Sequence, residues 1–85
     1  MLSKNEISNK VISLLSSHLG VNRDKIQMET DLYTGVISDG LGMIAFVNTL
    51  EKTFDIEVDN NVIGKWRRVK DIIDYVEESL KEKGS

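Results

Sequence analysis

The sequence predicts a small all-α bundle of three main helices and one short helix, with a long first loop. Three segments carry apolar residues at spacings of three and four, which is the period of one helix face. The chain has 85 residues, of which 40% are hydrophobic, and this is enough apolar material for one modest core. We therefore expect a single domain over residues 1–85.

The first helix is predicted between Ser3 and Gly20. Glu6 follows Ser3 at a distance of three residues, a spacing that lets each side chain accept a hydrogen bond from a backbone N–H at the helix start. Gly20 stands where a left-handed residue commonly ends a helix. The inward face is expected to contain Ile7, Val11, Leu14, Leu15 and Leu19.

A long loop is predicted over residues 21–38, because the helical period is lost there and turn-forming residues are frequent. We expect it to be ordered rather than a flexible linker. Five apolar residues should hold it against the bundle: Ile26, Leu32, Tyr33, Val36 and Ile37.

The second helix is predicted to begin at about residue 40 and to end at Phe54, with Asp39 as its N-cap. Its inward face would contain Leu41, Ile44, Val47, Leu50 and Phe54. A strand interpretation competes, because residues 39–40 form a hairpin-turn dipeptide and residues 56–62 could form a second hairpin. The length of the periodic run favours the helix.

The last third of the chain predicts two further helical segments. Residues 59–64 fit a short helical turn that Gly64 ends. An amphipathic closing helix follows, with Val69, Ile72, Ile73, Val76 and Leu80 on one face. The predicted core of the whole bundle contains Ile7, Val11, Leu14, Leu15, Leu19, Ile44, Val47, Leu50, Phe54, Ile72, Ile73 and Val76.

Composition argues against several classes of function. Eleven Lys and Arg against fourteen Asp and Glu give a net charge of −3, so no positive field attracts nucleic acid or anionic lipid. Cysteine is absent, which excludes disulfides and thiolate chemistry and favours the cytoplasm. No apolar run approaches the roughly 20 residues of a membrane span, so we expect a soluble protein without nucleic-acid or membrane partners.

Two ligand-binding patterns match only weakly. Gly40–Ala45 fits the glycine-rich dinucleotide pattern, but such a site needs a buried strand before it and a far longer chain. Acids alternate over Asp55–Asp59 as in a calcium loop, but the sixth and twelfth positions are Asn60 and Trp66 rather than Gly and Glu. We expect neither a dinucleotide nor a metal site.

No catalytic set is found either. His18 is the only histidine, and no serine lies in a nucleophile elbow. Asp71 and Asp74, one helical turn apart, are typical of a solvated face. Trp66 lies among the basic residues of 65–68 and could stack on a base, but core packing is the favoured interpretation.

Two segments carry a more specific pattern: Tyr33-Thr34-Gly35-Val36-Ile37-Ser38-Asp39-Gly40-Leu41-Gly42-Met43-Ile44 and Leu50-Glu51-Lys52-Thr53-Phe54-Asp55-Ile56-Glu57-Val58. They resemble the acyl carrier protein family. That family has Asp-Ser-Leu at the start of the second helix, then Leu-Glu-x-x-Phe at its end and Asp-Ile-Glu-Ile after it. Trp66, Val69 and Asp71–Val76 also match the family pattern. The resemblance as a whole extends from about Ile7 to Leu80.

The resemblance implies a prosthetic group. The Ser of Asp-Ser-Leu in the family carries 4'-phosphopantetheine, and acyl groups are attached to the thiol of that arm. The corresponding residue here is Gly40, which has no side-chain oxygen to form the phosphodiester. Ser38 is a poor substitute because it precedes the predicted helix cap. We therefore expect no phosphopantetheine on this chain, and a phosphopantetheinyl transferase as a partner only if residue 40 is Ser.

The resemblance also implies docking of the second helix on biosynthetic enzymes such as a synthase, ligase or acyltransferase. Carriers of fatty-acid synthesis usually have a strongly acidic second helix, whereas outward positions here include Gly42, Ala45, Asn48 and Lys52. The expected docking residues are Asp39, Leu41, Met43, Phe46, Glu51 and Asp55. For Phe46 core packing is an equal alternative. We expect a monomer.

Two functions follow from these observations. The first is an acyl or peptidyl carrier that presents thioester-bound intermediates to enzymes, here in a form that cannot be loaded because of Gly40. The second is a natural non-carrying adaptor or regulatory binding protein that uses the same helix. An enzyme is least supported, because no catalytic residues were found.

Overall fold

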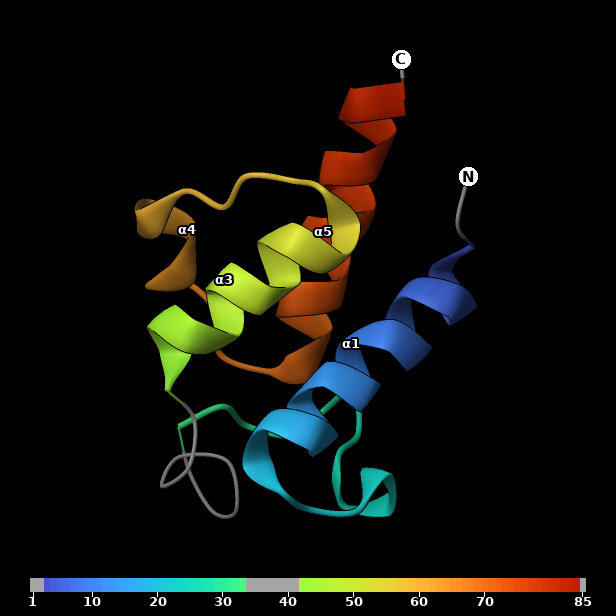
Figure 1. Cartoon of the computed structure of the whole chain (residues 1–85), viewed down its shortest axis with the longest axis vertical. Coiled ribbons are helices and arrows are strands. Elements are labelled where there is room, and N and C mark those ends of the chain that lie inside the picture. The colour runs from blue at the N-terminus through green and yellow to red at the C-terminus, as the bar shows by residue number, and fades with distance from the viewer. Residues whose placement is uncertain (1–2, 34–41, 85) are drawn as a thin grey trace.

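The structure is a computed structural model that describes residues 3–33 and 42–84. In these ranges the chain forms α1 (Lys4–Leu19), the 3-10 turn η1 (Arg23–Lys25), α3 (Met43–Phe54), α4 (Asn60–Ile63) and α5 (Val69–Gly84) (Figure 1). No strand occurs in them, and a single isolated bridge joins Asp31 to Arg68. The predicted all-α bundle is confirmed, and the hairpin interpretation of residues 56–62 is wrong.

Helix α1 is central to the bundle because it packs against both α5 and α3. Its start is the predicted capping box: the Glu6 N–H donates to Ser3 Oγ at 3.2 Å, and the Ser3 N–H donates to Glu6 Oε1 at 3.4 Å. Its end is the predicted left-handed glycine, Gly20, with φ 70°. Both ends of α1 are therefore determined by local residues.

Helix α3 starts later than the sequence predicts. Gly42 is its N-cap and Met43 its first residue, so the predicted start at about residue 40 and the predicted Asp39 cap are wrong. Glycine inside a helix costs about 1 kcal/mol relative to alanine, and a start at Met43 places Gly42 at the cap rather than inside the helix. Asp39, Gly40 and Leu41 lie outside the described residues.

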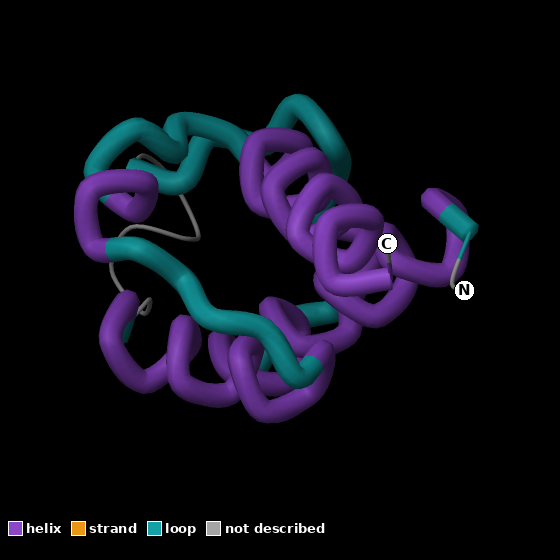
Figure 2. The backbone as a smooth tube through the Cα atoms, turned by 90° about the horizontal axis from the view of Figure 1, so that it is seen from above, coloured by secondary structure: helices purple, strands orange, loops and turns teal. Residues whose placement is uncertain are grey.

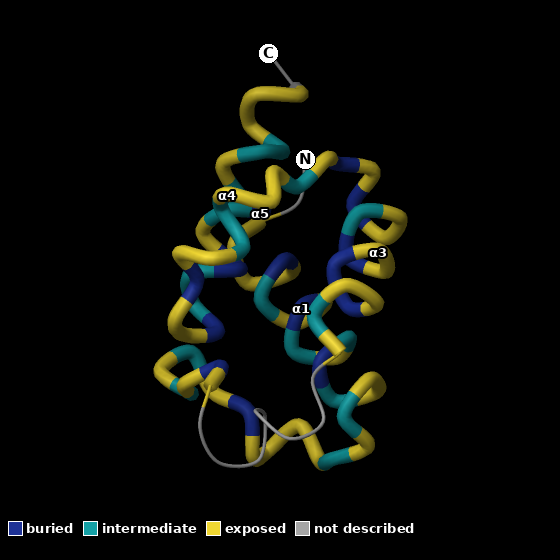
Figure 3. The backbone as a smooth tube through the Cα atoms, turned by 90° about the vertical axis from the view of Figure 1, so that its left-hand side faces the viewer, coloured by how far each residue is buried: buried dark blue, intermediate teal, exposed yellow. Residues whose placement is uncertain are grey.

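The core lies between the inward faces of α1, α3 and α5 (Figures 2 and 3). Buried residues of the segments that connect these helices complete it. Its buried members are Ile7, Val11, Leu15, Ile26, Leu32, Phe46, Val47, Leu50, Phe54, Ile56, Trp66, Val69, Ile72, Ile73 and Val76. Leu14 and Leu19 are only half-buried and pack against this set. Trp66 is buried against Tyr75, with ring centroids 5.9 Å apart, which confirms core packing for the tryptophan.

Two predicted apolar contacts are wrong. Ile44 is 81% exposed and Tyr33 is 48% exposed. The inward stripe of α3 runs through Phe46, Val47 and Leu50. The two spacings of three from Ile44 to Val47 to Leu50 drift around a helix of 3.6 residues per turn, so Ile44 falls beside that stripe rather than on it. Val36 and Ile37, also predicted to hold the first loop, lie outside the described residues.

The described part of the first loop is fastened to the start of α5. The Leu32 N–H donates to Arg67 O at 2.8 Å, and the Val69 N–H donates to Thr30 O at 3.0 Å. Glu29 forms ion pairs with Arg68 and Lys70 beside these bonds. The loop is thus held by backbone pairing as well as by apolar contacts.

None of the helices in the described ranges is long and apolar enough to cross a membrane.

Candidate functional site

The predicted docking surface is centred on α3, and the described residues place four of its six predicted members. Met43 is half-buried at the first position of the helix and packs against the core. Phe46 is fully buried and its ring meets the ring of His18 edge-on, with centroids 6.0 Å apart. Its side chain therefore offers no surface to a partner, and the core alternative holds for Phe46.

Glu51 holds the end of α3 together with the segment that follows it. One oxygen of its half-buried carboxylate, Oε2, accepts a hydrogen bond from the Val58 N–H at 2.9 Å. A hydrogen bond to a charged group is worth about 1.5–3 kcal/mol, so this contact has a structural role. The carboxylate that the sequence suggested for partner recognition is thus already bound within the chain.

Asp55 is also bound within the chain. It ends α3 in the left-handed conformation, with φ 55°. The Lys83 ammonium donates to Asp55 O at 2.6 Å and also contacts Asp55 Oδ2. The hydrogen bond from Lys83 to the Asp55 carboxylate and the positive charge of Lys83 lower the pKa of that carboxyl below its ordinary value. Asp55 and Lys83 therefore form an ion pair at the surface of the protein.

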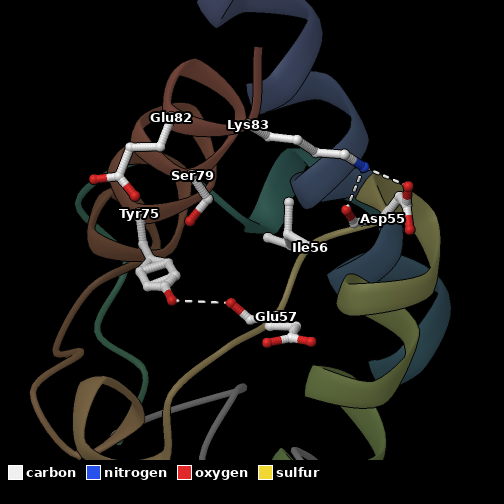
Figure 4. A pocket seen from close by; sticks show the side chains of 7 residues that line it. All are labelled: Asp55, Ile56, Glu57, Tyr75, Ser79, Glu82 and Lys83. Carbon is white, nitrogen blue, oxygen red and sulfur yellow. Dashed lines mark hydrogen bonds and ion pairs between the residues drawn. The ribbon is translucent and has the colours of Figure 1, made fainter. Parts of the chain in front are cut away.

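A second donor from α5 reaches the same extended segment (Figure 4). The Tyr75 hydroxyl donates to Glu57 O at 3.0 Å, so α5 supplies a donor to the carbonyls of both residue 55 and residue 57. A cavity of about 550 Å³ lies between the two elements. Its lining residues are Asp55, Ile56, Glu57, Tyr75, Ser79, Glu82 and Lys83. Asp59, the next acid, caps α4 by accepting from the Asn61 N–H at 2.8 Å.

The start of α3 presents a surface residue that sequence reasoning missed. Ile44, predicted to be core, is instead the most exposed large apolar side chain in the described residues. It shares a row at spacings of four with Asn48 and Lys52, both exposed. The signal available in the sequence was the pair of spacings of three from Ile44 to Val47 to Leu50, which do not stay on one face at 3.6 residues per turn.

The C-terminal end of α1 lies beside this corner. A Cβ added to Gly42 would lie 3.6 Å from His18 Nε2, which is ordinary van der Waals contact. His18 also contacts Phe46, so one exposed side chain of α1 lies beside the first turn of α3. The described part of the site therefore combines Met43 and Ile44 at the helix start with two acids at its end, of which Glu51 accepts a hydrogen bond and Asp55 forms an ion pair.

Comparison with known proteins gives a consistent set of relatives, although no protein-family model matches the chain. An acyl carrier protein of Thermotoga maritima is 34% identical over 80 residues, covering 94% of this chain and 99% of the relative. An acyl carrier protein of Akkermansia muciniphila is 33% identical over 76 residues, covering 89% and 95%. One from Trieres chinensis is 31% identical over 69 residues, covering 81% and 86%.

Proposed function

The chain belongs to the acyl carrier protein family, and from this premise we propose that it is a carrier that Gly40 keeps unloaded. Members of this family are not enzymes themselves; they carry phosphopantetheine and dock with biosynthetic enzymes. With a serine at position 40, the protein would present thioester-bound acyl or peptidyl intermediates to such enzymes. The observation that carries the proposal is a family match along nearly the whole chain, and we assign the attachment position to Gly40 from the residues around it.

The residues present do not fit covalently bound phosphopantetheine. Attachment needs a side-chain hydroxyl at the start of the second helix, and Gly40 provides none. The neighbouring Ser38 stands two residues earlier in the chain. We therefore assign no loading chemistry to this sequence, and we assign its function to recognition by partner enzymes.

Docking is proposed at the start of α3, through Asp39, Leu41, Met43 and Ile44. The exposure of Ile44 and the partial exposure of Met43 support this placement. Glu51 and Asp55 contribute less than the sequence suggested, because Val58 and Lys83 already bind their carboxylates. We further propose a cytoplasmic monomer in which residues 1–85 form one domain.

A loading assay tests the carrier proposal. The parent chain and Gly40→Ser are incubated with coenzyme A and a broad-specificity phosphopantetheinyl transferase, and intact masses are measured. The parent should gain no mass, and Gly40→Ser should gain one phosphopantetheine. Ser38→Ala in the parent is the control for the neighbouring hydroxyl. A folded Gly40→Ser variant that stays unmodified would count against the carrier, and loading of the parent that Ser38→Ala abolishes would assign the site to Ser38.

A second candidate function is a natural non-carrying adaptor. It is supported by the bundle itself, which is well packed and leaves an apolar side chain of α3 exposed, while Gly40, which we assign to the attachment position, has no hydroxyl. Reading codon 40 of the native gene separates the two functions. A native serine codon supports the carrier, and a native glycine codon supports the adaptor.

A further inference from the structure

A strip of positive charge lies where the chain passes from α4 into α5 (Figure 1). Residues 65–70, which we call the basic strip, read Lys-Trp-Arg-Arg-Val-Lys and contain four of the eleven bases of the chain and no acid. The rest of the chain has seven bases and all fourteen acids. The charge of the basic strip is therefore opposite in sign to the net charge of the protein.

The bases of the strip face outward because the apolar residues between them face inward. Trp66 and Val69 are buried in the core. The four basic residues around them are exposed or half-exposed: Lys65, Arg67, Arg68 and Lys70. Because they are close neighbours in the chain, their fields overlap at about 0.1 M salt, where the Debye length is about 10 Å. A partner therefore meets one positive surface rather than four separate charges.

The backbone of the basic strip is held in place by the rest of the fold. The Leu32 N–H donates to Arg67 O at 2.8 Å. Asp71 Oδ2 accepts from the Arg67 and Arg68 N–H groups at 2.9 and 3.0 Å. A ligand that binds the strip needs to order side chains only, so the entropic cost of binding is reduced.

One carboxylate of the chain shows what chemistry the basic strip binds. Glu29 forms ion pairs with Arg68 at 2.9 Å and with Lys70 at 3.4 Å, one through each carboxylate oxygen. Within the described residues, no acid forms an ion pair with Lys65 or Arg67. Half of the strip is thus matched by an acid of the chain itself, and the other half is open to carboxylates from a partner.

Other occupants fit the basic strip less well than protein carboxylates do. The net charge of −3 repels nucleic acid and anionic lipid at long range, and a nucleic-acid site with roughly 6–10 phosphate contacts needs more cations than this strip supplies. A second copy of the chain brings the same net charge of −3. The acid Asp74 that it could offer is already paired with Lys4 at 3.3 Å.

We infer that the basic strip is a docking surface for an acidic segment of a partner protein, whose carboxylates bind Lys65 and Arg67 as Glu29 binds Arg68 and Lys70. This goes beyond the carrier function, because it needs neither loading at residue 40 nor docking on α3. An exposed ion pair changes affinity by at most about fivefold. Several pairs must therefore act together, and binding must weaken as salt is added.

The test uses the full chain and a synthetic octaglutamate peptide with blocked ends, with octaglutamine as the uncharged control. Each peptide is titrated into isotope-labelled protein, and backbone amide shifts are followed by NMR. Octaglutamate should shift the amides of residues 65–70, and octaglutamine should not. Affinity should fall at least about tenfold from about 0.01 M to about 1 M salt, between which the Debye length falls from about 30 to about 3 Å.

Charge reversal locates the binding surface. Lys65→Glu and Arg67→Glu should each weaken octaglutamate binding about fivefold or more. Lys10→Glu, at an exposed residue of α1, is the matched control because it changes the net charge by the same amount. It should alter the affinity less than about twofold. Circular dichroism verifies that each variant is folded.

Removal of the internal carboxylate gives a test of opposite sign. Glu29→Gln frees Arg68 and Lys70, so it should strengthen octaglutamate binding about twofold to fivefold. A variant that binds more weakly than the parent would show that Glu29 does not compete with the peptide, and would contradict the inference.

Three further results would overturn the inference: no amide shifts at low salt, shifts confined to residues outside 65–70, or equal losses for Arg67→Glu and Lys10→Glu. Tighter binding of an oligouridylate or of anionic vesicles to the same residues would assign the strip to nucleic acid or lipid instead. None of these results bears on the loading of Gly40→Ser, so this inference and the carrier proposal fail separately.

Discussion

The two ends of α3 are built differently. At its start the helix has Gly42 as a cap without a side-chain hydrogen bond, and Ile44 points away from the core. At its end Glu51, Lys83 and Tyr75 all bind the segment that leads toward α4. The polar side chains at the end therefore stabilise the bundle, whereas the start leaves Ile44 exposed to solvent.

The largest expected contrast lies within the first turn of α3. Phe46→Ala should lower the free energy of unfolding by about 3–5 kcal/mol, because it empties a fully buried position. Ile44→Ala, two residues away, should change it by less than about 0.5 kcal/mol. Urea denaturation followed by circular dichroism measures both. Equal losses for the two variants would place Ile44 in the core and remove the contrast.

At the other end of α3, Glu51→Ala should destabilise the protein by about 1–2 kcal/mol, because the half-buried Val58 N–H loses its acceptor. Lys52→Ala is the matched control on the same turn and should cost less than about 0.5 kcal/mol. The same denaturation experiment compares them. If Glu51→Ala proves as mild as the control, the carboxylate is available to partners after all.

The start of α5 has side-chain hydrogen bonds to backbone N–H groups, whereas the start of α3 has none. Asp71 Oδ2 accepts from the Arg67 and Arg68 N–H groups at 2.9 and 3.0 Å, and these bonds lower the pKa of Asp71 below its ordinary value of 3.8. Asp71→Ala should cost about 0.5–1 kcal/mol at neutral pH. A lowered folded-state pKa means that this stability is present above pH 3.8 and is lost as pH falls through the lowered value.

Chemical denaturation at a series of pH values checks the sign. The stability difference between the parent and Asp71→Ala should be constant above about pH 5 and should shrink below about pH 4. Asp71→Asn, which keeps an acceptor oxygen but no charge, should show no such decline relative to Asp71→Ala. A difference that grows on acidification would contradict the assigned hydrogen bonds.

The smallest expected effect comes from giving α3 the cap that it lacks. Gly42 has φ −71° and ψ 91°, which a serine adopts without strain, and its added Cβ would only touch His18 Nε2. Gly42→Ser should raise the free energy of unfolding by about 0.5 kcal/mol. The midpoint of thermal unfolding, which measures the change, should rise slightly. Gly42→Ala is the control, because it restricts the unfolded chain without adding an oxygen. A serine no better than alanine would show that the start of α3 is not limited by its cap.

The bundle could be predicted because its signals are local. The period of three and four residues identifies inward faces, and Ser3, Glu6 and Gly20 determine the ends of α1 through contacts within one turn. The segments around Gly40 carry the family pattern, and the absence of a hydroxyl at that position follows from the residue type alone. Local geometry and covalent chemistry need no knowledge of distant segments.

The surface of α3 was decided by tertiary contacts. Ile44 is not part of the core because the packed stripe of α3 runs through Phe46 instead. Asp55 forms an ion pair because Lys83, which follows it by twenty-eight residues, reaches it in the folded chain. Which of several apolar or acidic side chains stays free depends on where other helices come to rest, and a single helical period cannot specify that.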